Sequence, residues 1–243
     1  MSGYDANGNL AFKTDARNLV SIYSYDVLNR LLSKSYSNDA SRTTTSCYQY
    51  DSSSLAGSNA YLIGRLTNQW TQSASVGACP AAVPTTGPWT RRSILAYDVM
   101  GRVLSERQCT PSNCTGGTPY APAYTYDLAG ATHTFTDGIT LFTNTFDSAG
   151  RLLTLTSSWS DATHPSQLFS AQTATSTPCV QSLSAAYAPF GGLMNATFGN
   201  GLSLNRTFDN RLRTTCEIDT GGIVASPTSG SATISVTGAE QSK

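Results

Sequence analysis

An aromatic residue followed by a short turn-forming block recurs eight times along the 243-residue chain, and this repeat constrains the fold more than any other feature. The aromatic residues stand at positions 4, 25, 50, 97, 126, 146, 187 and 208. The motif residues of the clearer copies are Tyr25, Asp26, Asn29 and Arg30; Tyr97, Asp98, Gly101 and Arg102; Tyr126, Asp127 and Gly130; Phe146, Asp147, Gly150 and Arg151; and Phe208 and Asp209. Repetition at this scale predicts an architecture built from one supersecondary unit.

Each block has the composition of a β-hairpin tip. An Asp at the first position of a type I turn accepts backbone hydrogen bonds, and a Gly three residues later supplies the positive φ that closes the turn into a bulge. Asn29 replaces the Gly in the second copy, and Asn is the non-glycine residue that best tolerates this conformation. Asp137-Gly138 and Asn200-Gly201 predict a second kind of hairpin turn upstream of two motifs.

The residues before each aromatic position alternate with period two, which is typical of a β-strand. Residues that fall on one face in this way are Tyr120, Pro122, Tyr124 and Tyr126; Tyr23 and Tyr25; Tyr48 and Tyr50; and Phe142 and Phe146. After the turn, Arg-Leu-Leu or Arg-Val-Leu begins a return strand. We therefore predict an all-β fold in which antiparallel β-hairpin repeats form a curved or spiralling sheet.

The motif Tyr-Asp-x-x-Gly-Arg-Leu resembles the YD repeat of the RHS-repeat family, and the resemblance covers about residues 4–215. The family includes bacterial polymorphic toxins, the shell subunits of Tc toxins and the animal teneurins. Its members wind such hairpins into a spiralling sheet that closes as a hollow shell, often around a toxic C-terminal domain. The resemblance implies that this chain is part of such a shell. It also implies that its partner is the rest of the shell or an enclosed domain, and that the full-length protein is secreted or at the cell surface.

The spacing of the motifs predicts how the chain is organised. Intervals near 20 residues fit one unit, so the longer intervals hold insertions, and Gly64-Arg65-Leu66 is interpreted as the second half of the Tyr50 unit. Surface loops are expected at 73–88, 109–122 and 160–178 because these stretches are rich in turn-forming residues. We assign residues 1–218 to the repeat region and 219–243 to a tail, interpreted as the truncated start of a following β module with one strand at 230–238.

Composition excludes several classes of partner. Charged residues make up 12% of the chain, the net charge is zero, and Arg91-Arg92 is the only basic cluster, so the footprint that nucleic acid requires is lacking. No apolar run approaches the roughly 18 residues of a membrane helix. The first motif begins at Tyr4, so we expect no signal peptide in this chain. Family shells are longer than this sequence, and we interpret it as a fragment.

The six cysteines stand at positions 47, 79, 109, 114, 179 and 216, an even count that suits disulfides. Cys109 and Cys114 bracket the turn-forming Thr-Pro-Ser-Asn and are the predicted pair, while the other pairings stay open. A zinc site is the alternative, but no Cys-x-x-Cys is present and only His133 and His164 offer imidazole ligands. We therefore predict no metal and no cofactor.

Catalysis requires a nucleophile with a base and an orienting group, and two histidines leave few such combinations. His133 follows a turn near Asp137, and His164 precedes Pro165 in an expected loop. No nucleophile elbow, phosphate-binding loop or His-Glu-x-x-His motif is found. The Asp and Arg of each motif recur, which indicates exposed structural ion pairs at the turn tips. We predict a protein that is not an enzyme.

Two classes of function remain. In the first, the chain is a structural segment of a β-shell that encloses or displays a toxin-like domain, and its aromatic residues line one continuous face. In the second, it is a cell-surface adhesion or carbohydrate-binding module that uses Trp70, Trp89 and Trp159 to stack on sugars. A packing role for these tryptophans is the simpler interpretation. An exposed aromatic cluster in the loops would favour adhesion.

Overall fold

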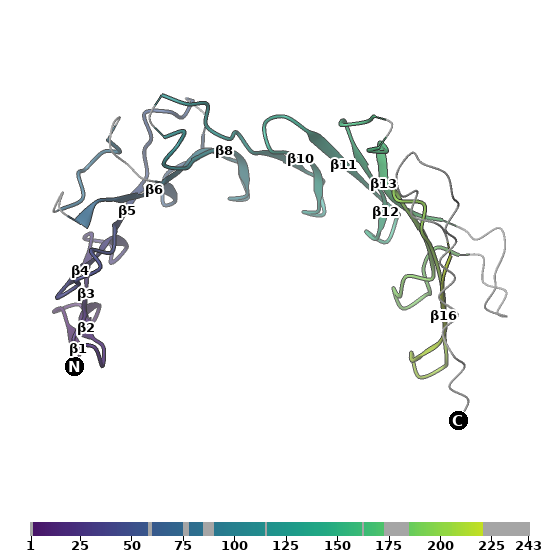
Figure 1. Ribbon diagram of the computed structural model, residues 1–243, viewed down its shortest axis with the longest axis horizontal. Coiled ribbons are helices and arrows are strands. Elements are labelled where there is room, and N and C mark those ends of the chain that lie inside the picture. The colour runs from purple at the N-terminus through teal and green to yellow at the C-terminus, as the bar shows by residue number, and fades with distance from the viewer. Residues whose placement is uncertain are drawn as a thin grey trace. The chain divides into compact units, whose positions relative to one another are not determined.

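The computed structural model describes residues 2–57, 60–74, 78–84, 90–114, 116–161, 163–172 and 185–220. Within these residues the regular secondary structure is β-strand (Figure 1). The strands are β1 (Ser2–Tyr4), β2 (Leu10–Thr14), β3 (Val20–Tyr25), β4 (Leu31–Ser37), β5 (Thr45–Tyr50), β6 (Leu66–Gln72), β7 (Thr90–Tyr97), β8 (Val103–Cys109), β9 (Ala123–Tyr126), β10 (Thr132–Thr136), β11 (Leu141–Phe146), β12 (Leu152–Ser157), β13 (Gln167–Ala171), β14 (Asn195–Phe198), β15 (Ser203–Phe208) and β16 (Thr214–Thr220).

The strands are hydrogen-bonded to one another in sequence order, from β1 to β16. The pairs with a described register are antiparallel, as in β3 with β4 and β11 with β12. The all-β prediction is therefore confirmed. The chain divides into two compact units, residues 1–124 and 125–243, and each is described by itself below.

The first unit contains strands β1 to β8, and the sheet that they form bends along its length (Figure 1). Its most buried side chains lie in β5 to β8, where Trp70 is 2% exposed and Ile94 is 3% exposed. The segment between β5 and β6 packs against this part of the sheet, since the backbone amide of Tyr97 donates to the carbonyl of Ala60 at 2.9 Å. The insertions expected from the motif spacing therefore cover the sheet locally.

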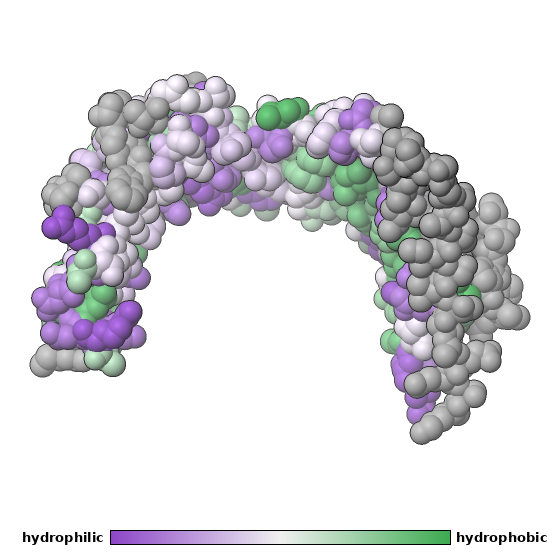
Figure 2. Space-filling view, in the orientation of Figure 1, coloured by the Kyte–Doolittle hydropathy of each residue, from purple (hydrophilic) through white to green (hydrophobic). Residues whose placement is uncertain are grey.

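The second unit contains strands β10 to β16, again in a curved sheet (Figure 1). Hydrophobic residues gather over the strands around β11 to β13 (Figure 2). Phe135 and Phe142 are cross-strand partners in β10 and β11, and their rings stack with centroids 4.7 Å apart. Phe169 of β13 meets its partner Phe198 of β14 edge to face at 5.7 Å. Such cross-strand aromatic pairs stabilise the sheet.

A register shift marks the aromatic position of the repeat. The ladder between β3 and β4 skips a residue at Ser24/Tyr25, and that between β11 and β12 skips one at Thr145/Phe146. Equivalent shifts occur at Tyr50, Tyr97 and Phe208. Each shift is a β-bulge, and it strengthens the twist of the hairpin just before its turn.

Two disulfides are described, Cys47–Cys79 and Cys109–Cys114. The first joins β5 to the segment after β6, and the second closes a loop directly after β8. Cys216 of β16 is also disulfide-bonded. Cys179, Trp89 and the strand expected at 230–238 lie outside the described residues, as does most of the 219–243 tail.

Candidate functional site: the turns and the contacts between repeats

The motif turn has the same backbone geometry in each clear copy. In the copy at Tyr97, the amide of Asp98 donates to the carbonyl of Arg102 at 2.9 Å, and the amide of Gly101 donates to the carbonyl of Asp98 at 3.0 Å. Gly101 has φ 87°, which only glycine adopts without strain. The same pair of bonds closes the turns that begin at Asp5, Asp26, Asp127, Asp147 and Asp209. This is the turn with a closing bulge that the Asp-x-x-Gly pattern predicts.

The Asp side chain holds the turn from inside. One carboxylate oxygen of Asp98 accepts from the amides of Met100 and Arg102, both at 2.9 Å, and the other accepts from the Arg102 guanidinium at 2.6 Å. Asp26, Asp147 and Asp209 make the equivalent set of bonds. The Asp and Arg of the motif therefore act together on one turn.

These ion pairs differ from the exposed pairs that the sequence suggested. The side chains of Asp26, Asp98 and Asp147 are only 15–17% exposed, because the turn backbone and the Arg stem cover them. The amide of Arg30 is the main cause that lowers the pKa of Asp26, and the Arg30 guanidinium adds to it against the opposing effect of burial. The carboxylates are thus held in their charged form within the turn.

Two residues other than glycine occupy the closing position of the turn with positive φ. Asn29 has φ 62°, in the conformation anticipated for it, and Leu212 has φ 63° in the copy at Phe208. A branched apolar residue is strained there, since its Cβ approaches the carbonyl oxygen. A further turn of this type runs from Asp15 to Leu19, with Asn18 at φ 64°. The sequence reasoning missed it, although Asp-x-x-Asn was its signal.

In four copies the motif tyrosine connects its repeat to the preceding one. Its hydroxyl donates to the backbone carbonyl of the residue that opens the return strand of the repeat before it. The four described bonds are Tyr25 to Leu10 at 3.0 Å, Tyr50 to Leu31 at 2.9 Å, Tyr97 to Leu66 at 2.7 Å and Tyr187 to Leu152 at 2.5 Å. Sequence reasoning assigned these tyrosines to packing and missed this bond, which we call the tyrosine staple.

The motif arginine completes the same contact from the other side. The guanidinium carbon of Arg30 lies 4.5 Å from the ring centre of Tyr50, that of Arg65 lies 5.3 Å from Tyr97, and that of Arg151 lies 4.8 Å from Tyr187. In each case the arginine directly precedes the leucine whose carbonyl accepts the hydroxyl. A cation over an aromatic face is stabilising, so ring and hydroxyl are both held by the preceding repeat.

A charged bridge joins two of the turns. Both terminal nitrogens of Arg30 donate to the two carboxylate oxygens of Asp51, at 2.9 and 2.7 Å, while its Nε donates to Asp26. The Arg30 guanidinium and the amide of Gly64 lower the pKa of Asp51 to about 2. A bidentate pair of this kind fixes the relative position of the two turns.

The Tyr50 unit is interrupted as its sequence predicts. The amide of Asp51 donates to the carbonyl of Arg65 at 3.0 Å, and Tyr50 pairs with Leu66 across the ladder. The residues between them form an insertion inside the turn. Arg65 occupies the place of the motif arginine, but its guanidinium donates to the carbonyl of Tyr61 and lies over the ring of Tyr97.

The remaining motif residues vary this arrangement. Tyr126 ends β9, and the turn from Asp127 through Gly130 closes on Ala131, which stands where other copies have Arg. Phe146 and Phe208 have no hydroxyl, so they cannot form the staple. The ring of Phe208 instead packs edge to face on Phe190, with centroids 5.1 Å apart.

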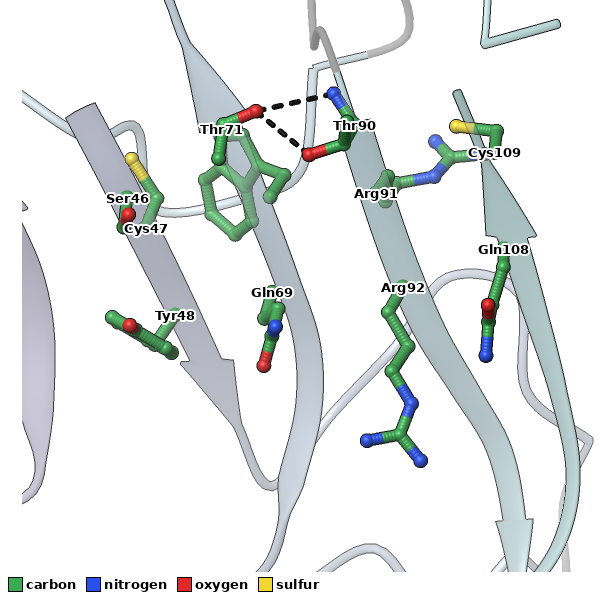
Figure 3. A pocket seen from close by; sticks show the side chains of 11 residues that line it. Ser46, Cys47, Tyr48, Gln69, Thr71, Thr90, Arg91, Arg92, Gln108 and Cys109 are labelled. Atoms are coloured by element: carbon green, nitrogen blue, oxygen red, sulfur yellow. Dashed lines mark hydrogen bonds between the residues drawn. The ribbon is translucent and has the colours of Figure 1, made fainter. Parts of the chain in front are cut away.

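A polar depression of about 280 Å³ lies on strands β5 to β8 (Figure 3). Tyr48, Gln69, Arg92 and Gln108 form a row of cross-strand partners along it. Arg92 donates to Glu106 at 2.6 Å, and Glu106 is 2% exposed. Its two cysteines, Cys47 and Cys109, are in disulfides. The depression therefore combines Arg92, which is paired with Glu106, and a second arginine, Arg91, with amides and hydroxyls.

Other candidate groups in the described part of the chain have structural partners. No group of three or more His, Cys, Asp or Glu side chains that could hold a metal is found there. Trp70 is buried, and Trp159 is 55% exposed but stacks on His164 with centroids 4.0 Å apart. His164 in turn bonds Asp161 at 2.8 Å. These contacts give no support to an exposed aromatic cluster for sugar binding.

One further observation concerns only the described residues. Among them, no helix has the length and apolar character that a membrane crossing requires.

Comparison with known proteins agrees with the motif analysis. The family model for the RHS Repeat matches residues 4–41, which include the turns at Asp5, Asp15 and Asp26. The chain carries an RHS repeat. None of the curated protein sequences matches it.

Solved structures share the fold of this chain. A crystal structure of TcdB2-TccC3-Cdc42 matches with a TM-score of 0.64 and 15% identity over 90% of the chain. TcdB2-TccC3 matches with a TM-score of 0.63 and 14% identity over 91%. The Tc holotoxin pore of Photorhabdus luminescens, with a mutation in TccC3, matches with a TM-score of 0.61 and 15% identity over 91%. The chain spans about a tenth of the length of these solved chains, at 10 to 11%.

Proposed function

We propose that this chain is a non-catalytic wall segment of a larger RHS-type shell that encloses or displays a toxin-like domain, and that the complete protein is secreted or at the cell surface. The repeated tyrosine staple is the observation that supports this function most directly. It joins four repeats to the preceding one through a backbone carbonyl, and in three of them an arginine lies over the tyrosine ring, so the sheet can be extended repeat by repeat.

Two further observations support a role as a wall. The geometry that recurs from repeat to repeat closes the turns and forms the contacts between repeats. The Asp and Arg of the motif form ion pairs with each other within the turns. One of the solved structures that share the fold is a Tc holotoxin pore, as its name states. A wall isolates its contents sterically, which requires a continuous sheet and no reactive group.

The native assembly provides the test. An antibody raised against the folded chain would isolate the native protein from its source cells, and electron microscopy would then image it before and after mild protease treatment. We expect a hollow particle, together with a further domain that resists protease until the particle is unfolded. A native species of 25.7 kDa without any additional domain would overturn the proposal.

A further inference from the structure

We propose that a cleft between the turn at Asp137 and the loop after β12 binds a lysine side chain of a partner polypeptide. The cleft has a volume of about 440 Å³ and is lined by Asp137, Ile139, Thr140, Ser158 and Trp159. All of these residues belong to the second unit, and they lie in or beside connections that are not motif turns. The inference goes beyond the proposed function and does not depend on it.

The walls of the cleft are apolar and exposed. Ile139 is 89% exposed and Trp159 is 55% exposed, although each is a large apolar side chain. Leu141, at the start of β11, is exposed as well. Covering such side chains removes apolar surface from water, which is favourable. The cleft therefore favours a ligand with a hydrocarbon stem.

Hydrogen bonds fix the two walls relative to each other. The backbone amide of Ser158 donates to the carbonyl of Leu141 at 2.8 Å, and the amide of Leu141 donates to Ser158 Oγ at 2.9 Å. The Trp159 ring stacks on His164, with ring centres 4.0 Å apart and planes inclined by 22°. His164 is held in turn by Asp161 at 2.8 Å. Trp159 is thus in place before a ligand binds, which lowers the entropic cost of binding.

Asp137 supplies a negative charge at the cleft. Its Oδ1 accepts from the backbone amides of Ile139 and Thr140, both at 2.8 Å. The Thr140 amide is the main cause that lowers the pKa of Asp137, and the Ile139 amide adds to it, so the carboxylate is charged at neutral pH. Its Oδ2 has no hydrogen-bond partner within the described part of the chain. This oxygen is therefore free to accept from a cation.

A lysine side chain matches these groups. Its stem can lie along Ile139 and Trp159 while its ammonium donates to Asp137 and lies over the indole ring. One free carboxylate oxygen suits the compact charge of an ammonium better than the bidentate fork of an arginine. Asp161 does not compete for the ligand, because His164 bonds both of its carboxylate oxygens.

Two matched tripeptides test the cleft: acetyl-Ala-Lys-Ala-amide, and the same peptide with norleucine in place of lysine. Norleucine keeps the hydrocarbon stem but has no charge. Each peptide would be titrated into the full chain, and the NMR signal of the Trp159 indole N–H would report binding. This signal is assigned by its absence from the Trp159→Phe variant. We expect the lysine peptide to bind about fivefold more tightly, through its ion pair and its contact with the ring.

Variants separate the charge from the apolar walls. Asp137→Asn retains an oxygen that accepts the turn amides, and it should weaken binding of the lysine peptide about threefold without affecting the norleucine peptide. Ile139→Ala should weaken both peptides by the same factor. Leu128→Ala is the matched control and should change neither affinity, because Leu128 is an exposed apolar residue of a motif turn outside the cleft.

Three outcomes would overturn the proposal. One is the absence of a saturable shift with the lysine peptide. Another is equal binding of the two peptides, or an unaltered preference for lysine in Asp137→Asn, because the charge would then play no part. The third is tighter binding of butylammonium than of the lysine peptide, which would assign the cleft to a free amine. The wall function is tested on the native assembly, so its failure is distinguishable from a failure at this cleft.

Discussion

Strands β5 to β8 and strands β10 to β12 are built from the same hairpin repeat, but they are buried to different extents. In the first region each strand contributes buried residues, including Trp70, Ser93 and Glu106. In the second, from Thr132 to Ser157, Thr140 is the only buried residue. The motif by itself therefore builds a single layer whose two faces both stay partly exposed.

The insertions account for the difference. Side chains of β5 and β6 bond the segment after β6, where Gln49 donates to the carbonyl of Ala81 at 3.3 Å and Gln72 donates to that of Ala78 at 3.4 Å. Cys79 of the same segment is bonded to Cys47. A sheet needs a second layer to bury a core, and here the loops provide it. Strands β10 to β12 have short turns and depend on their ladders and aromatic pairs.

The largest expected effect concerns the core of β5 to β8. Trp70→Ala should destabilise the first unit by about 3–5 kcal/mol, because a large buried side chain is lost and a cavity remains. Urea unfolding followed by circular dichroism measures this loss. Trp159→Ala is the control and should change stability little, since Trp159 is 55% exposed. Similar effects of the two substitutions would show that the two regions do not differ in packing as described.

Removal of the disulfides should cause the next largest loss of stability. Opening Cys47–Cys79, which spans 32 residues, should cost about 3.7 kcal/mol by the loop-entropy relation, and opening Cys109–Cys114, which spans 5, should cost about 2 kcal/mol. Paired Cys→Ala variants would be compared by chemical unfolding in each case. If the shorter loop proved the more important, the covering segment after β6 would not be the main support of this region.

The tyrosine staple should contribute equally in the two units. Tyr97→Phe and Tyr187→Phe should each destabilise the fold by about 1 kcal/mol, the net value of one hydrogen bond. Hydrogen exchange at the accepting strands, β6 and β12, locates the effect. Tyr61→Phe is a control, because Tyr61 is 53% exposed in the insertion. An effect confined to Tyr97 would limit the staple to the covered region.

Removing the backbone strain at Leu212 should increase the stability of the fold by a smaller amount. Leu212→Gly should stabilise the last turn by up to about 1 kcal/mol, since glycine removes the penalty of positive φ but adds entropy to the unfolded chain. Gly101→Ala is the opposite test and should destabilise, because the added Cβ would lie 3.2 Å from the Arg65 side chain in a strained conformation. Thermal unfolding of both variants checks the sign of each change.

The smallest expected effect is a dependence on acid pH. The pKa of Asp51 is lowered from 3.8 to about 2 in the folded chain, so its contribution is complete above the unfolded pKa and is lost as the pH falls from about 4 to about 2. In the Arg30→Gln variant, the free energy of unfolding should change less between about pH 4 and about pH 2, and chemical unfolding at several pH values measures this. An unaltered pH dependence in that variant would remove the Arg30–Asp51 bridge from the explanation.

Much of the local structure was predictable from the sequence. The Asp-x-x-Gly turns and the positive φ of Asn29 follow from short-range chemistry, because turn closure involves residues that are neighbours in the chain. The interrupted Tyr50 unit was predictable because Gly64-Arg65-Leu66 repeats the second half of the motif. The turn at Asp15 was overlooked because Thr14, and not an aromatic residue, precedes it. The polar row of Tyr48, Gln69, Arg92 and Gln108 could not be predicted, since cross-strand register joins residues from four strands.

A series of antiparallel hairpins is predictable from the amino-acid sequence alone, because Gly and Asn at fixed positions satisfy a local conformational demand. The contacts of each motif residue depend on the folded chain. The Tyr50 hydroxyl donates to the backbone carbonyl of Leu31, and the Arg30 guanidinium donates to both Asp26 and Asp51. These contacts join residues about 20 positions apart, and only the pairing of the strands brings them within hydrogen-bonding distance.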